Sequence, residues 1–293
     1  MLLNLSGQFS KTSPDQTHLF VYARMSAAYY QISTGAITEA KAAIEECLPL
    51  VEAFVGVDPS IKAVFYRVRS EFDKVKALFA AYYRDAFLYL ACINLEEVSA
   101  QECLEQAHDL CVAALSGETI FNFGELLMHP ILETLKGTRF EYLHATLHAF
   151  NNGDHETLEA LLPALQSNAI IAPRLAFLRQ KMCLMALVEC VFAFMKSSRR
   201  IPFSTISVAA QVPIGEVEFL LMKALSVGIL RGTINQPDQI IVVDWVQPRV
   251  LDRDQLVQLR SSIRTWKARI QGISASIDLT SSLPILQEEL VQQ

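Results

Sequence analysis

The sequence predicts a mostly α-helical protein: an αα helical-repeat array, then a winged-helix subdomain with a small antiparallel sheet, then one long C-terminal helix. Three observations support this fold class. Amphipathic segments with short breaks extend to about residue 196, two β-branched runs follow between residues 229 and 247, and apolar residues near the C-terminus recur at gaps of three and four. These patterns are typical of packed helices, a β-hairpin and a helix with one continuous apolar stripe.

The first part of the chain reads as helix after helix. Breaks such as STG, GVDPS and NLEE separate the segments, and SGETIFNFGELLMHP is a longer interruption that contains two glycines and a proline. Paired amphipathic helices with short links favour an array of the solenoid kind, although no strict consensus repeats. The helices are expected near residues 17–34, 37–55, 61–80, 82–93, 97–115, 138–151, 155–166 and 171–196.

The pattern changes at Arg199. RRIPFS is short and extended, STISVAAQV is a short helix that Ser204 or Thr205 should cap, and PIGEVEFLLMKALSVG is a second helix that should end at Gly228. ILRGTIN and QIIVVDWVQ then form a hairpin around QPDQ. Strand, helix, helix and two-stranded wing is the order of a winged helix.

These observations predict three domains. Residues 1–85 form N-terminal helical repeats, residues 86–251 form a second domain, and residues 252–293 form the C-terminal helix and tail. The second domain has a helical part at 86–181 and a winged helix at 182–251.

The most regular pattern in the sequence lies in the C-terminal helix. A single helix cannot bury its own stripe, so this one needs a partner surface. Three heptads span about 30 Å at 1.5 Å per residue, which is longer than most grooves within one domain. We therefore favour another chain as the partner, with packing against its own domain as the alternative. The seam consists of Leu256, Leu259, Ile263, Trp266, Ile270, Ile273 and Ile277.

Nucleic acid is not expected as a partner. The formal net charge of the chain is −6, and the second winged-helix segment carries Glu216, Glu218 and a single cation, Lys223. Reading a DNA groove needs Arg, Lys, Asn or Gln at base edges and cations at phosphates. Protein contact is the better use of this subdomain, with the hairpin extending a neighbouring sheet edge, and a wing that only closes its own fold is the alternative. The residues expected at this contact are Arg231, Ile240, Val242 and Trp245.

No motif in the sequence indicates chemistry. His144 and His148 are spaced as zinc ligands on one helix face, but a zincin needs glutamate at the following position, where this sequence has Ala145. A GK[ST] phosphate loop and a GxSxG elbow are both missing from the sequence. We therefore expect no enzyme activity, no metal, no cofactor and no small-molecule ligand. A metal-dependent hydrolase that uses the two histidines is the remote alternative.

The sequence also indicates where the protein works. No run reaches the roughly 18 apolar residues that a membrane span requires, so no membrane association is expected. The six cysteines form no CxxC pair, which favours reduced thiols in an intracellular protein.

Four stretches of the sequence resemble the PCI-domain subunits of the proteasome regulatory particle lid, of the non-ATPase regulatory subunit thirteen type. They are FNFGELLMHPILETL (121–135), YLHATLHAFNNGD (142–154), FLLMKALSVGILRGTI (219–234) and WVQPRVLD (245–252). The resemblance covers about residues 60 to 278, whereas the first sixteen residues match poorly. Because chains of this family are longer at the N-terminus, the repeats at residues 1–85 are expected to be shortened.

The resemblance implies a PCI domain at residues 86–251 and a non-catalytic scaffold. Such subunits bind other PCI subunits of the proteasome lid through their winged helices, and their C-terminal helices join one bundle. That role supports ubiquitin-dependent protein degradation in the cytoplasm and nucleus. The alternatives are a PCI subunit of a sister complex, either the signalosome or a translation initiation factor, and a nucleic-acid-binding winged-helix protein. The string WVQPRVLD argues against a sister complex.

Overall fold

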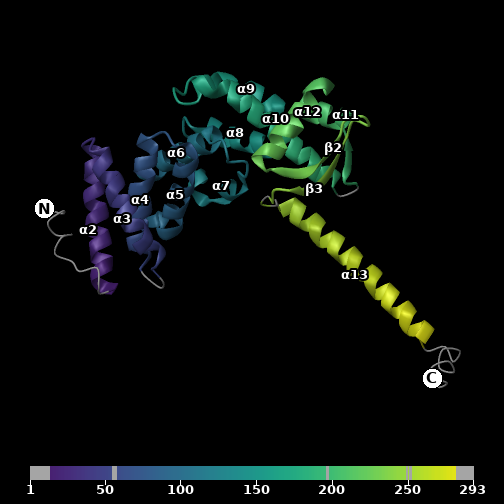
Figure 1. Ribbon diagram of the computed structural model, residues 1–293, viewed down its shortest axis with the longest axis horizontal. Helices are drawn as coiled ribbons and strands as arrows, with labels where there is room; N and C mark the ends of the chain where they lie inside the picture. The colour runs from purple at the N-terminus through teal and green to yellow at the C-terminus, as the bar shows by residue number, and fades with distance from the viewer. Residues whose placement is uncertain (1–13, 55–57, 196–197, 249, 251–252, 282–293) are drawn as a thin grey trace. The chain divides into compact units, whose positions relative to one another are not determined.

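The computed structural model describes residues 14–54, 58–195, 198–248, 250 and 253–281 (Figure 1). Within these ranges it confirms the predicted fold class, because most residues are helical and the strands form one small antiparallel sheet. The chain divides into two units, Met1–Pro248 and Arg249–Gln293, and each is described by itself.

The N-terminal part of the first unit is a stack of helices close to the predicted positions. Helix α2 packs on α3 and α4, α4 packs on α5, and α5 packs on α6, so neighbours in sequence are neighbours in space (Figure 1). This is the arrangement expected of a solenoid. Met25, Cys47 and Phe65 are fully buried where α2, α3 and α4 meet. The bounds are α2 (Pro14–Ser33), α3 (Ile37–Glu52), α4 (Pro59–Val75), α5 (Phe79–Cys92) and α6 (Ala100–Ser116).

Two buried carboxyl groups lie where α4 meets α5. Asp73 and Asp85 are 6% and 1% exposed, respectively. The two carboxyl groups lie close enough to share one hydrogen bond, which would require one of them to carry a proton. Arg69 Nε lies 2.7 Å from one carboxylate oxygen of Asp85, and Arg84 Nε lies 3.3 Å from the other. Burial, followed by the neighbouring charge of Asp85, raises the pKa of Asp73 to about 7.

Asp73→Asn should therefore stabilise the protein at alkaline pH. A carboxyl group whose pKa is raised by folding contributes stability that is lost as the pH rises from its ordinary value, 3.8, to about 7. Asparagine keeps a hydrogen-bond donor towards Asp85 and carries no charge. We expect the variant to exceed the wild type by about 1–3 kcal/mol at pH 8, with the difference disappearing towards pH 4. Urea denaturation of both proteins between pH 4 and pH 8 measures this difference in the free energy of unfolding. A difference that does not change with pH would contradict the shared proton.

A second core follows in the chain and extends from α5 into the winged helix. Leu110, Phe123, Phe150 and Met185 are fully buried in it. The interruption SGETIFNFGELLMHP (116–130) and the residues just after it contain two short helices, α7 and η2. The elements are α7 (Gly124–Met128), η2 (Pro130–Leu135), α8 (Glu141–Asn152), α9 (His155–Gln166), η3 (Ala172–Arg174) and α10 (Leu175–Phe194), and η1 (Leu95–Glu97) precedes α6.

Two cationic side chains, one from α10 and one from the short helix η3 before it, bond the carbonyl groups at the C-terminal end of α6. Lys181 is 1% exposed, and its Nζ donates to the carbonyl oxygens of Ala114, Leu115 and Gly117 at 2.7, 3.2 and 2.7 Å. Arg174 Nη1 donates to Ser116 O at 3.1 Å. A helix leaves its last carbonyls without intrahelical partners, and cations are favourable at that end. The helical repeats are thereby tied to α10, which packs against the winged helix.

The winged helix has the predicted order of strand, helix, helix and hairpin. Its strands lie in the order β1-β3-β2, and both pairs are antiparallel. Helix α12 ends at Gly228 as predicted, because this residue adopts φ +81° and its N–H bonds back to Ala224 O and Leu225 O. Val217 and Leu221 of α12 are fully buried, as is Ile241 of the sheet. The bounds are β1 (Arg200–Pro202), α11 (Phe203–Ala210), α12 (Ile214–Val227), β2 (Leu230–Asn235) and β3 (Ile240–Val246).

The second unit contains one helix, α13 (Arg253–Ser281), in its described part. All seven residues of the predicted heptad stripe lie within this helix. In the described residues, no single helix is long and apolar enough to cross a membrane, and α11 with α12 meets that length and composition only as a pair bent by 86°.

Candidate assembly interfaces

The heptad stripe lies exposed on α13. The six seam side chains that the structure describes are between 46% and 66% exposed. They are Leu256, Leu259, Ile263, Trp266, Ile270 and Ile273. Ile277 lies in the same helix, but its side chain is outside the described residues. Apolar residues at this spacing and exposure form a surface that a second helix could cover.

A β-bulge brings two of the predicted winged-helix residues together. The pairing of β2 with β3 shifts between Arg231 and Gly232: Arg231 lies opposite Trp245, whereas Gly232 lies opposite Val243. A Cβ at position 232 would come within 2.2 Å of Val242 O, so only glycine fits this bulge. The guanidinium carbon of Arg231 lies 4.8 Å from the centre of the Trp245 ring, within the range of a cation–π contact. Arginine and tryptophan are the side chains most enriched at binding hot spots.

The other two predicted wing residues have a different position. Ile240 and Val242 are half-buried on β3, which is the central strand of the sheet because β1 pairs with its other edge. Their backbone N–H and C=O groups are partly used in pairing with β1 and β2, so not all of them are free to bond a neighbouring chain. The longer free edge of this sheet is β2, and Arg231, Thr233 and Asn235 are exposed along it.

The outer face of α12 mixes apolar and charged side chains and is not basic. Phe219 and Met222 are exposed there, and Lys223 is the only cation on the helix. A hollow of about 1050 Å³ runs between this helix and α10, with Phe177, Leu184 and Phe219 in its lining. Apolar side chains of this kind offer a contact surface for a protein and no hydrogen bonds to bases or phosphates.

The two histidines considered as metal ligands lie on α8. Their rings are 4.7 Å apart between centroids and meet edge to face. Burial lowers the pKa of His144, so its ring is neutral near pH 7. In the part of the chain that the structure describes, no group of three or more His, Cys, Asp or Glu side chains is placed to hold a metal ion.

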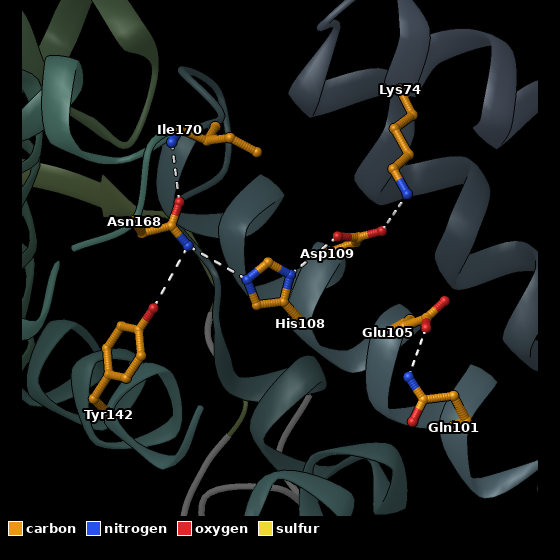
Figure 2. Close-up of polar contacts among 8 residues, drawn as sticks. All are labelled: Lys74, Gln101, Glu105, His108, Asp109, Tyr142, Asn168 and Ile170. Carbon is orange, nitrogen blue, oxygen red and sulfur yellow. Dashed lines mark hydrogen bonds and ion pairs between the residues drawn. The ribbon is translucent and has the colours of Figure 1, made fainter. Parts of the chain in front are cut away.

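A polar network that the sequence reasoning missed runs through α6 (Figure 2). His108 Nδ1 lies 3.1 Å from Asp109 Oδ1, and His108 Nε2 lies 3.3 Å from Asn168 Nδ2. The carboxylate can only accept and the amide nitrogen can only donate, which places the histidine proton on Nδ1. Lys74 of α4 also donates to Asp109. Burial acts to raise the pKa of Asp109, but the bonds and charges of His108 and Lys74 together outweigh it, so the pKa is lowered.

Two family models match the chain. The model described as PSD13 N-terminal repeats matches residues 1–147, and the PCI domain model matches residues 158–245. The chain belongs to the PSD13 family of proteasome regulatory subunits. The resemblance that the four sequence stretches indicated is therefore confirmed. The first match includes residues 1–16, so the expectation that these residues match the family poorly was wrong. The predicted domain boundaries after residues 85 and 251 stay predictions.

Individual relatives agree with this membership. The probable 26S proteasome regulatory subunit rpn9 of Schizosaccharomyces pombe is 37% identical over 261 residues, which cover 89% of this chain and 68% of that protein. The 26S proteasome non-ATPase regulatory subunit 13 homolog A of Arabidopsis thaliana is 35% identical over 269 residues, which cover 90% and 70%. Eukaryotic translation initiation factor 3 subunit M of Aspergillus terreus is 24% identical over 188 residues, which cover 63% and 40%. The initiation-factor subunit is thus a more distant relative.

Proposed function

We propose that this chain is a non-catalytic scaffold subunit of the proteasome regulatory particle lid. The observation that carries the proposal is the exposed seam on α13: six described apolar side chains at heptad spacing, in a member of the PSD13 family. A seam of this kind gains little free energy until another helix covers it, because its side chains remain in water. The partners are other PCI subunits of the lid, whose C-terminal helices form one bundle with α13. The protein thereby supports ubiquitin-dependent degradation in the cytoplasm and nucleus, without a cofactor, metal or small-molecule ligand.

The winged helix provides the second contact. Main-chain hydrogen bonding to a neighbouring subunit takes place along β2, the longer free edge of the sheet. The stacked pair of Arg231 and Trp245 lies next to that edge and anchors the partner. Ile240 and Val242, on the central strand, contribute only through their side chains.

Affinity purification of the tagged chain from its own cell extract tests this function. The full-length protein is compared with a version that ends at Leu251, and the recovered proteins are identified by mass spectrometry. We expect lid subunits with the full chain and their loss on truncation. Recovery by both versions would assign assembly to the winged helix alone, and recovery of signalosome or initiation-factor subunits would move the chain to a sister complex. Recovery of no PCI subunit would contradict the scaffold role.

A further inference from the structure

A hollow of about 340 Å³ lies between α4, α5 and α6, with Tyr29 of α2 at its side, well away from the winged helix in the chain. Its volume is within the range of about 300–1,000 Å³ that ligand pockets occupy. The buried side chains of Tyr82, Tyr89 and Leu110 contribute to its lining. The hollow is therefore a concave site with an aromatic floor, on the part of the chain that matches the family's N-terminal repeats.

The charges around this hollow do not balance. Four carboxylates and two cations line it, which leaves a surplus of two negative charges (four minus two). Arg67 pairs with Glu102 at 2.8 Å, and Lys74 pairs with Asp109. Glu71 and Glu105 form no ion pair within 4.0 Å of a described residue, although the charges of both help to raise the pKa of Lys74. Figure 2 shows Glu105 one turn from Asp109 on α6, with its only drawn contact a hydrogen bond of 2.7 Å from Gln101 Nε2.

An unused acceptor lies in the same wall. The side-chain oxygen of Gln106, one residue beyond Glu105, is buried and has no hydrogen-bond partner among the described residues. A buried acceptor without a partner costs about 1–3 kcal/mol, so a donor that reaches it is favoured. Glu71 and Glu105 are the accessible acceptors beside this oxygen, and the ligand that two carboxylates suit is a cationic donor.

A second hollow of about 250 Å³ adjoins the first and shares Tyr29 and Arg67 with it. Tyr22 and Tyr30 of α2 line this hollow, and they are 50% and 62% exposed. Exposed tyrosines next to a buried polar pocket are typical of protein-binding surfaces, because they offer a large apolar area with little loss of conformational entropy on binding.

We propose that the two hollows together bind a basic peptide segment of a partner protein. One lysine or arginine side chain of the peptide enters the larger hollow, where Glu71 and Glu105 neutralise it. Apolar residues beside that cation lie over the tyrosines of α2. The surplus negative charge selects a cation, and the aromatic floor favours it further through cation–π attraction. This contact is separate from the α13 seam and from the winged helix, and it does not depend on the scaffold proposal.

Three short peptides test the proposal on the full chain. They are acetyl-Ala-Tyr-Lys-Leu-Ala-amide, the same peptide with arginine in place of lysine, and the same peptide with uncharged norleucine in place of lysine. Binding is followed by calorimetry and by chemical shifts in the protein. We expect at least one cationic peptide to bind about tenfold more tightly than the norleucine peptide, and more weakly at high salt. Equal affinity for all three, or no binding of either cationic peptide at millimolar concentration, would overturn the proposal.

Two double variants locate the binding. Glu71→Gln with Glu105→Gln removes the surplus charge of the hollow at nearly constant shape. Glu105 is exposed and Glu71 only partly buried, so we expect the fold to be retained. Glu216→Gln with Glu218→Gln makes the same change in net charge on the winged helix and serves as the matched control. We expect about a tenfold loss of affinity for the cationic peptide in the first variant and none in the second. Equal losses in both would mean that the peptide responds only to net charge, which would overturn the assignment of this hollow.

Discussion

Lys181→Met should lower the free energy of unfolding by about 2–4 kcal/mol, one of the largest effects of any single substitution in this protein. Methionine has a similar length and is apolar, so the packing against the surrounding helices is largely kept. What it removes is the hydrogen bonding of three carbonyls at and beyond the end of α6, at positions 114, 115 and 117. Each carbonyl would then be buried without a donor. The ammonium also lies between 5.2 and 5.8 Å from the ring centres of Phe121, Phe123 and Phe177, and these contacts are lost too.

Burial and hydrogen bonding shift the pKa of Lys181 in opposite directions. Burial lowers its pKa to about 7, because an ammonium is poorly stabilised away from water. Three acceptors match its three N–H donors, and the negative end of the α6 dipole favours the charged form. Either protonation state can donate to carbonyls, whereas methionine can donate to none. The expected destabilisation therefore holds on both sides of neutral pH.

Urea denaturation followed by circular dichroism measures this effect. Lys223→Met is the matched control, because Lys223 is exposed on α12 and the same change there leaves no buried carbonyl without a donor. Hydrogen exchange should also rise in residues 117–123, which follow α6 and are held by Lys181. A Lys181→Met protein that unfolds at the same urea concentration as the Lys223→Met protein would show that the cap contributes nothing to stability.

The periodic elements of this fold could be predicted from the sequence to within a few residues. The α-helices of the N-terminal stack and the winged-helix order follow from apolar spacing, and the end of α12 follows from Gly228. The start of α11 was predicted wrongly. Ser204 or Thr205 was expected as its N-cap, but the helix begins at Phe203 after Pro202, with no side-chain cap bond. Proline fixes the backbone there, and local composition alone favoured the hydroxyl residues.

Contacts between distant residues were not predictable. Lys181 bonds carbonyls 64 to 67 residues earlier in the chain, and no local pattern marks a lysine in an apolar helix as a cap. Because the three-residue strand β1 pairs with β3, β3 is the central strand of the sheet. Ile240 and Val242 therefore do not lie on a free edge. The polar hollow is likewise assembled from four helices. Its one local signal was the acidic face of α6, where Glu102, Glu105 and Asp109 recur at helical spacing.

Trp266→Asp should prevent assembly while leaving the free chain folded. Trp266 is 66% exposed at the middle of the α13 seam, and tryptophans in such positions commonly contribute 2 kcal/mol or more to binding. Aspartate would add a charge that the closed bundle must bury, so we expect affinity for partner subunits to fall by about a hundredfold or more. Ile263→Asp, one turn earlier on the same stripe, should act in the same way.

The same substitutions decide between the two partners considered for this seam. If another chain covers it, the purified Trp266→Asp protein should melt within about 1–2 °C of the wild type, since an exposed surface position contributes little to stability. If the stripe packs within its own chain, the free monomer should melt several degrees earlier, and the assembly role of α13 would be wrong. Ser261→Asp is the matched control, because it adds the same charge on the face of α13 furthest from the seam, where Ser261 is exposed. Co-purification of lid subunits with Ser261→Asp, and their loss with Trp266→Asp at an unchanged melting temperature, would assign assembly to the stripe and not to the helix as a whole.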